Sequence, residues 1–261
     1  MKTGLIKIRE LLVLLLITGC AGSSPSPVGS PSAGPPVITS YEEAVRELKS
    51  EDTNVRCNAL MYLGASGDTR AIGPISRQLS DPELLVRLTT VQALRNFNSP
   101  LTIEPLRVAL KDQDRDLRYS AAVALYELGD YSGEDALIEG LSSPRAEFRE
   151  FALLALGKIR SRQAVPGIIK LLRDPKTRTR SDAAYVLGLL RADSAVDPLL
   201  AALEDPVKWV RKDSWTALTE ITGQNFDFHY DGPEELRAAE LAVWRQWRRR
   251  ERSSPSRKDN E

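Results

Sequence analysis

The amino-acid sequence predicts an all-α fold, namely a right-handed α-solenoid of stacked helix pairs with a 31-residue repeat. An arginine recurs at this constant interval without insertion, at Arg56, Arg87, Arg118, Arg149, Arg180 and Arg211. A leucine lies seven positions after each arginine, and another recurs later in each of the first five repeats, at Leu79, Leu110, Leu141, Leu172 and Leu203. An unbroken repeat of this length is typical of a solenoid and argues against a globular enzyme built around one pocket.

Each repeat is expected to contain two helices. Asp-Pro pairs at residues 81–82, 174–175 and 205–206 combine a capping carboxylate with a proline suited to the first helical turn, so we expect the first helix to begin there. Small and apolar residues follow at helical spacing. Glycines are expected to end the first helix, at Gly64, Gly157 and Gly188. Prolines are expected in the first turn of the second helix, at Pro74, Pro105 and Pro198.

This pattern resembles the HEAT repeat family, specifically the short repeats of phycobilisome lyases and many bacterial scaffold proteins. The resemblance covers residues 41–222 and is carried by an aspartate with an arginine six positions later: Asp81 with Arg87, Asp112 with Arg118, Asp174 with Arg180, and Asp205 with Arg211. Guanidinium groups suit carboxylates and helix-terminal carbonyls, so we expect a structural ladder between neighbouring repeats rather than a phosphate-binding stripe. Ser143 replaces the aspartate in the fourth repeat, which puts one rung in question.

The N-terminal segment has the pattern of a secretory signal. Residues 1–19 combine basic residues with an apolar run, 11–17, that is too short for a stable membrane span. Residues 17–20 resemble a bacterial lipobox, which implies a lipoprotein signal peptide, lipid on Cys20 and an outer-membrane location if the cell has one. An ordinary signal peptide or a short signal anchor is the alternative.

The remaining segments follow from composition. Residues 20–39 are rich in Ser, Pro and Gly and are expected to form a linker. The solenoid is expected over residues 40–222, with an N-terminal half repeat opened by a capping box at Ser40 and then about six units. Cys57 is expected to be a buried or half-buried thiol in the first unit.

The C-terminal segment departs from the repeat. Residues 223–252 are expected to form a capping loop and helix, and residues 253–261 a disordered tail. The predicted apolar face of this helix comprises Leu236, Ala239, Val243, Trp244 and Trp247. A basic cluster lies near its end: Arg245, Arg248, Arg249, Arg250 and Arg252. These arginines leave open an alternative in which the helix binds a membrane surface or a partner.

The sequence offers little chemistry for catalysis. A single histidine, His229, excludes His-rich metal sites and an iron centre like that of the HEAT-type deoxyhypusine hydroxylases. Phosphate loops, CxxC pairs and nucleophile elbows are missing from the sequence. Residues 20–244 carry a net charge of about −6, which disfavours nucleic acid. We therefore expect no catalytic residue, no metal and no cofactor.

These observations favour a membrane-anchored, extracytoplasmic scaffold that binds a protein partner. Aromatic and apolar residues on the predicted outer face form a candidate partner patch: Tyr119, Tyr126, Phe151, Leu154 and Tyr185. Burial of the same residues in the solenoid is the alternative. Mixed charges on the second helices also suit a protein or peptide. Two other functions remain open: a lyase-like enzyme subunit, by resemblance to phycobilisome lyases, and envelope attachment through the basic C-terminal helix.

Overall fold

The computed structural model describes residues 37–253, and the regular secondary structure of this range is entirely helical. The longer helix of each repeat, the A helix, is α3 (Thr53–Ser66), α5 (Leu84–Asn96), α7 (Arg115–Glu127), α9 (Ala146–Lys158), α11 (Thr177–Leu189) or α13 (Lys208–Thr222). The shorter B helices are α2 (Tyr41–Glu47), α4 (Ile72–Arg77), α6 (Ile103–Ala109), α8 (Glu134–Gly140), α10 (Val165–Leu171) and α12 (Val196–Ala202). Short 3₁₀ turns flank some B helices, at Thr69–Ala71, Gln78–Ser80, Pro100–Thr102 and Asp193–Ala195. A last helix, α14 (Glu234–Ser253), follows the repeats.

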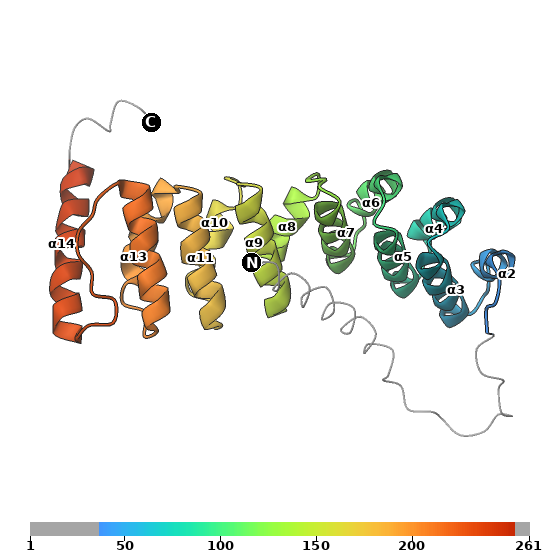
Figure 1. The fold of residues 1–261 in the computed structure, drawn as a ribbon, viewed down its shortest axis with the longest axis horizontal. Helices are drawn as coiled ribbons and strands as arrows, with labels where there is room; N and C mark the ends of the chain where they lie inside the picture. The colour runs from blue at the N-terminus through green and yellow to red at the C-terminus, as the bar shows by residue number, and fades with distance from the viewer. Residues whose placement is uncertain (1–36, 254–261) are drawn as a thin grey trace, which may run out of the picture. The chain divides into compact units, whose positions relative to one another are not determined.

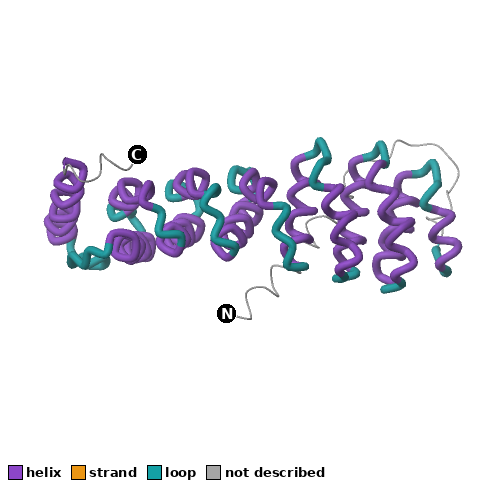
Figure 2. Tube along the Cα trace, turned by 90° about the horizontal axis from the view of Figure 1, so that it is seen from above, coloured by secondary structure: helices purple, strands orange, loops and turns teal. Residues whose placement is uncertain are grey.

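The helices stack in chain order, as Figure 1 shows for the A helices from α3 to α13. Each B helix packs against an adjacent A helix, and the view from above in Figure 2 shows the helices in two rows. These arrangements confirm the predicted all-α solenoid. Because each helix pair contacts only its neighbours, the long surfaces of the two rows stay available for contacts with other molecules.

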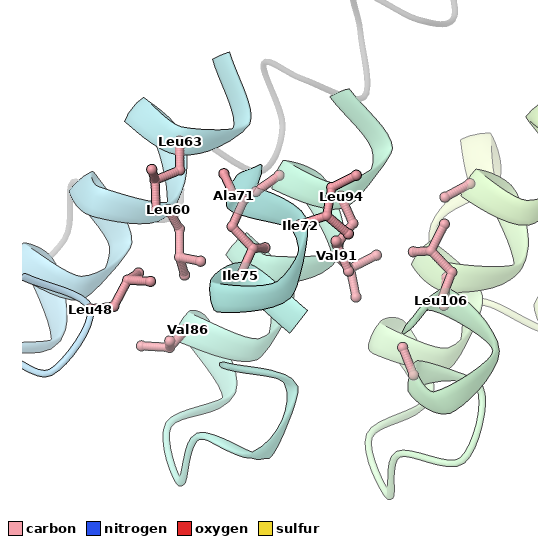
Figure 3. Packing of buried hydrophobic residues seen from close by; sticks show 14 of the residues in the cluster. Leu48, Leu60, Leu63, Ala71, Ile72, Ile75, Val86, Val91, Leu94 and Leu106 are labelled. Atoms are coloured by element: carbon pink, nitrogen blue, oxygen red, sulfur yellow. The ribbon is translucent and has the colours of Figure 1, made fainter. Parts of the chain in front are cut away.

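Leucines of the repeat pattern form the core between successive units. Leu60, Leu63 and Leu94 are fully buried, and they lie with Ile75 in one continuous apolar cluster (Figure 3). Burying one such side chain contributes about 1.5–3 kcal/mol relative to leaving it exposed. The leucine spacing seen in the sequence therefore corresponds to the interfaces that hold the repeats together.

The A helices begin later than the Asp-Pro pairs predict. The structure places Asp81 and Pro82 in the turn before α5, whose first residue is Leu84. The reason is that the carboxylate of Asp81 accepts the amide N–H of Glu83 at 2.9 Å, closing a turn rather than capping a helix. Asp174 and Asp205 accept the amides of Lys176 and Val207 in the same way, each at 2.8 Å.

The recurring glycines also serve a different purpose from the one predicted. Gly64 and Gly157 lie inside the last turns of α3 and α9, with helical backbone. A Cβ on Gly64 would come within 2.8 Å of Ala93 on the next A helix, and one on Gly157 within 2.9 Å of Val186. These glycines allow neighbouring A helices to approach closely, and they do not terminate them.

A position just after each of the first five A helices adopts a left-handed backbone. It recurs in register with the repeat, at Gly67, Asn98, Gly129, Arg160 and Arg191, with φ between 45° and 79°. Glycine and asparagine tolerate this conformation, whereas arginine pays a steric cost. Repeats four and five therefore carry backbone strain that the earlier repeats avoid.

This strain makes a testable prediction. Replacing Arg191 with Gly should raise the free energy of unfolding by about 1 kcal/mol, because glycine adopts positive φ without a Cβ clash. Urea denaturation of wild type and Arg191→Gly measures the change. Asn98→Gly is the matched control and should raise the value by less, since Asn already tolerates this conformation. A decrease for Arg191→Gly would contradict the account.

An aromatic wedge occupies the middle of the solenoid. Tyr119 stacks on Phe148 with ring centroids 4.4 Å apart, and its hydroxyl donates to the Phe148 carbonyl at 2.9 Å. Phe151 meets both Tyr119 and Tyr126 edge to face. The helices that carry these rings, α7 and α9, approach each other less closely than the other successive A helices do. At the other interfaces, small residues let successive A helices pack closely. Between α7 and α9 the aromatic rings fill the wider space.

Candidate binding surfaces

A ladder of ion pairs runs along the junctions between repeats. Each rung joins an arginine on an A helix to the aspartate in the turn that opens the next repeat. The rungs are Arg56–Asp81, Arg87–Asp112, Arg149–Asp174 and Arg180–Asp205, with Nε–Oδ2 distances of 2.9, 2.8, 2.7 and 2.7 Å. The same guanidinium groups donate to carbonyls five and six positions earlier, as Arg87 does to Asp81 and Pro82. One arginine thus links a turn of its own repeat to the next repeat.

Two arginines of the series find other acceptors. Ser143 supplies no carboxylate, so Arg118 instead donates to Glu139 on α8 at 2.6 Å. At the end of the series Arg211 donates to the backbone carbonyl of Tyr230 at 2.7 Å. Burial and the nearby charge of Arg237 lower the pKa of Arg211. Every arginine of the series is thus engaged inside the solenoid, which favours a structural role over a phosphate-binding stripe.

The ladder aspartate Asp174 holds its charge through these contacts. Burial alone would raise the pKa of Asp174, but hydrogen bonds from Arg149 and from the Lys176 amide outweigh it and lower the pKa. A carboxyl group with a lowered folded-state pKa stabilises the fold above its unfolded pKa, and this stabilisation is lost as the pH falls through the folded value. The Arg149–Asp174 rung therefore belongs to the interactions that fail in acid.

An open groove of about 760 Å³ lies on the B-helix side, between the ends of α10 and α12. Its floor is apolar and includes Ile169, Pro198 and Ala201. Lys170 and Arg173 lie on the α10 side, whereas Asp197 and Glu204 lie on the α12 side. A groove with an apolar floor and charges of opposite sign on its two sides can orient an extended polypeptide segment.

Helix α14 lies beside this groove and engages its acidic side. Arg245 contacts Glu204 at 2.7 Å, and Arg248 contacts Asp197 at 3.0 Å. Arg252 also donates to Asp197. Hydrogen bonds from Arg248, and secondarily from Arg252, lower the pKa of Asp197 despite its partial burial. Three of the five predicted basic residues thus bind the α12 region, while Arg249 and Arg250 are exposed.

The face that α14 buries matches the predicted one only in part: Trp244 and Trp247 pack as expected, whereas other members of that face do not. Leu241 and Trp244 are buried, with Trp244 fully enclosed against Phe226 and Trp247. Leu236 and Val243, which the helical wheel places on the apolar face, are 40% and 47% exposed. The reason is that the loop 223–233 supplies Phe226 as the docking ring and thereby sets the rotation of the helix. Helix α14 packs on the end of the solenoid, and Ala239 of the predicted apolar face is exposed together with Leu236 and Val243.

His229 links the preceding loop to α14. Its Nδ1 lies 2.5 Å from the Glu240 carboxylate, and its amide donates to the same group at 2.7 Å. The hydrogen bond and charge of Glu240, with smaller contributions from Asp227 and Asp231, raise the pKa of His229. Glu240, which interrupts the apolar stripe in the sequence, is thus the partner of the single histidine.

This contact predicts a pH dependence. Because the folded-state pKa of His229 is raised, its stabilising contribution is fully present below the unfolded value of about 6.5 and is lost as the pH rises through the folded value. Proton NMR of the histidine ring, which is unique in the chain, should show a titration midpoint above this unfolded value. Glu240→Gln should bring the midpoint back toward it. Equal midpoints in the two proteins would contradict the assignment.

Comparison with models of known protein families shows to which family the chain is related. A model of HEAT repeats matches residues 42–130 and 134–219. The chain belongs to the HEAT-repeat family. The two matches meet near the aromatic wedge between repeats three and four. No curated protein sequence matches the chain at a significant level.

Solved structures share the fold of this HEAT-repeat protein. A computationally designed armadillo repeat protein for modular peptide recognition is 17% identical, with a TM-score of 0.51 over 70% of this chain and 100% of that one. A designed armadillo repeat protein in complex with the peptide (KR)4 is 18% identical, with a TM-score of 0.50 over 70% and 100%. The CpcE–CpcF complex of phycocyanin lyase from Nostoc sp. PCC7120 gives 20% identity and a TM-score of 0.47 over 85% and 99%.

The candidate partner patch is only partly on the surface of the HEAT-repeat solenoid. Tyr119 and Phe151 are 3% and 9% exposed, because they form the aromatic wedge between α7 and α9. The expectation that they face a partner is therefore wrong. Leu154 and Tyr185 are exposed, at 39% and 56%, and Tyr126 is half-buried. What remains is a smaller apolar strip on α9 and α11.

The other predicted positions divide between described and undescribed parts of the chain. Cys57 is buried on α3, where its sulfur accepts from the hydroxyl of Thr89 at 3.6 Å. Cys20, with the signal, most of the linker and residues 254–261, lies outside the described residues. Within residues 37–253 no group of three His, Cys, Asp or Glu side chains is placed to hold a metal ion. In the same range, every helix is too short or too polar to cross a bilayer.

The contacts of Asp197 and Glu204 with α14 were not anticipated from the sequence. Their partners lie 41 to 55 residues away and outside the repeat register, so periodicity gives no signal for them. The arginines at the left-handed positions 160 and 191 did carry a signal. They stand where other repeats have Gly or Asn.

Proposed function

We propose that this HEAT-repeat protein is a membrane-anchored, extracytoplasmic scaffold that binds an extended segment of a protein partner along its B-helix side. The groove between α10 and α12 carries the proposal, because it joins an apolar floor to charged walls at the end of a long repeat surface. The fold is shared with a designed protein that binds the (KR)4 peptide. Lys170 and Arg173 on one wall favour a partner segment that carries acidic residues.

The anchor in this proposal is Cys20. The lipobox-like residues 17–20 support lipidation, and the Ser/Pro/Gly-rich residues that follow would hold the solenoid away from the membrane. A tethered solenoid searches for partners near its membrane. Ala21 follows Cys20, where an aspartate would resemble an inner-membrane retention signal. This supports the outer membrane as the location.

The anchor and the groove are tested together in cells. Wild type, Cys20→Ser and Lys170→Glu/Arg173→Glu are crosslinked, captured and compared, and each is also fractionated and labelled with a fatty-acid analogue. Cys20→Ser should lose the label and leave the membrane fraction. The charge reversal should stay in the membrane and lose the captured partner.

A matched control reverses two exposed charges outside the groove, as Lys49→Glu/Arg77→Glu. This control should keep both the membrane location and the partner. A partner retained by the groove variant would contradict the binding site, whereas label and membrane association retained by Cys20→Ser would contradict the anchor. The two parts of the proposal therefore fail separately.

A further inference from the structure

A second hollow, of about 480 Å³, lies at the opposite edge of the solenoid, where α11 ends. Three arginines line it, namely Arg160 and Arg162 after α9 and Arg191 after α11. Leu189, Leu190 and Glu220 complete the wall together with Gly188. It shares no residue with the groove between α10 and α12. The two hollows are separate places for a ligand.

The three arginines of the hollow differ from the ladder arginines. Every arginine of the repeat series donates to a carboxylate or to backbone carbonyls. Among the described residues, by contrast, the guanidinium groups of Arg160, Arg162 and Arg191 form neither an ion pair nor a hydrogen bond. They are exposed and line one cavity. Three guanidinium groups against the single carboxylate of Glu220 around one hollow favour an anionic ligand.

The sequence of repeat four does not neutralise the charge of Arg160 and Arg162. Residues 151–173 contain five basic residues and no acidic one, whereas residues 119–142 contain five acidic residues and no basic one. The acidic residues of that preceding repeat are largely engaged elsewhere. Glu127, Asp130 and Glu139 pair with Arg95, Arg107 and Arg118 of their own or the preceding repeat. The positive charge of repeat four is therefore available to another molecule.

The backbone supports the same conclusion. Arg160 and Arg191 occupy the left-handed position with φ of 57° and 48°, where Gly67 and Gly129 occupy the equivalent position in other repeats. A glycine would remove the strain at both positions. Arginine at both of these strained sites, on adjacent turns that line one hollow, indicates that the side chains rather than the backbone are what these turns provide.

An apolar strip leads into the hollow along α11. Leu189 lines the hollow and is 36% exposed, and Tyr185 lies one helical turn before it and is 56% exposed. Leu154 occupies the position on α9 equivalent to Tyr185 and is also exposed. A ligand that carried only charge would leave this strip uncovered, whereas a polypeptide with an apolar side chain beside its carboxylates would cover it.

We propose that this hollow binds an acidic segment of a protein partner. Its carboxylates pair with Arg160, Arg162 and Arg191, and an apolar side chain packs on Leu189 and Tyr185. Glu220, which lies over Gly188 in the same hollow, repels a carboxylate and directs the segment toward the arginines. The site is independent of the proposed B-helix groove, so one chain can hold two polypeptides at once.

Binding of a fluorescein-labelled peptide tests the site on the full chain purified in detergent, with Lys170→Glu/Arg173→Glu present in every protein so that the groove between α10 and α12 does not take up the acidic probe. The probe is a glutamate-rich decapeptide with one phenylalanine, followed by fluorescence anisotropy at low salt. Arg160→Gly/Arg191→Gly and, separately, Arg162→Gln should each weaken binding by about tenfold or more. The double glycine variant should at the same time melt at a higher temperature than wild type, which separates loss of the site from loss of the fold.

Matched controls fix the interpretation. Asn98→Gly changes the same backbone position without removing a charge and should leave peptide binding unchanged. Arg77→Gln/Arg249→Gln removes two exposed charges elsewhere and should leave binding within about twofold. The proposal is overturned if binding survives in both hollow variants, or if the distant control loses it equally. Stronger displacement by inorganic phosphate than by unlabelled peptide, or tighter binding to phosphatidylglycerol vesicles, would also overturn it.

Discussion

Trp244→Ala should release α14 from the solenoid while leaving the repeats folded. Trp244 is fully buried against Phe226 and Trp247, so truncation removes the main apolar contact of the helix at a cost of about 3–5 kcal/mol. Because stacked repeats depend mainly on their nearest neighbours, the loss should remain at the C-terminal end. Hydrogen–deuterium exchange should become fast over residues 234–253 and stay unchanged over α3 to α9.

Trp244→Phe provides the control for this experiment. The indole N–H of Trp244 is buried without a hydrogen-bond partner among the described residues, so phenylalanine keeps much of the apolar contact and removes an unsatisfied donor. Exchange over residues 234–253 should then stay slow. Fast exchange throughout the chain in Trp244→Ala would show that α14 supports the whole solenoid, and unchanged exchange would show that the ion pairs to the α12 region suffice.

Asp174→Ala should lower the free energy of unfolding by about 3 kcal/mol. The Asp174 side chain is 3% exposed and accepts two hydrogen bonds from Arg149 and one from the Lys176 amide. Removing the carboxylate leaves Arg149, whose side chain is 11% exposed, with a buried charge that only carbonyls satisfy. Urea denaturation near neutral pH measures the loss.

Glu104→Ala is the surface counterpart of this change. Glu104 pairs with Arg107, but its side chain is 78% exposed, so the expected loss is below about 1 kcal/mol. Ser143→Asp tests the missing rung from the other direction and should restore a carboxylate within reach of Arg118 without loss of stability. A loss for Asp174→Ala no larger than for Glu104→Ala would contradict the structural importance of the ladder.

The arginine period predicted the solenoid because one arginine per repeat has the same task at every junction. The chain position of its acceptor was harder to infer. Arg87 lies six positions after Asp81 in the sequence, yet it contacts only the carbonyl of that residue and takes the carboxylate of Asp112. The sequence pattern pairs each arginine with the aspartate of its own repeat. In the stacked repeats the arginine instead forms its ion pair with the aspartate of the next repeat.

The predicted outer patch depended on one assumed rotation of the A helices. That rotation holds for Leu154 and Tyr185, which are exposed. It fails for Tyr119 and Phe151, because α7 and α9 are spread apart and their rings fill the interface. One helix rotation applied to every repeat describes interfaces built from small residues well. Bulky rings change the packing of a single interface, and the common rotation then fails there.

The C-terminal helix was predictable as an amphipathic element but not in its orientation. Its apolar residues occur on two sides: Trp244 is buried as predicted, and its contact with Phe226 from the preceding loop selects Leu241 over Leu236 and Val243. The arginine hollow could not be predicted from the sequence either, because only the structure shows that its three guanidinium groups lie around one cavity.

The most direct test of the account is site-specific photocrosslinking of the solenoid in cells. A photoreactive residue at Ala201, which is exposed in the groove between α10 and α12, should form an adduct with the protein partner. The same residue at Met61, exposed on α3 far along the chain, should not. The account predicts that the Ala201 adduct disappears in Lys170→Glu/Arg173→Glu. An adduct from Met61 but not from Ala201 would contradict binding along the B-helix groove.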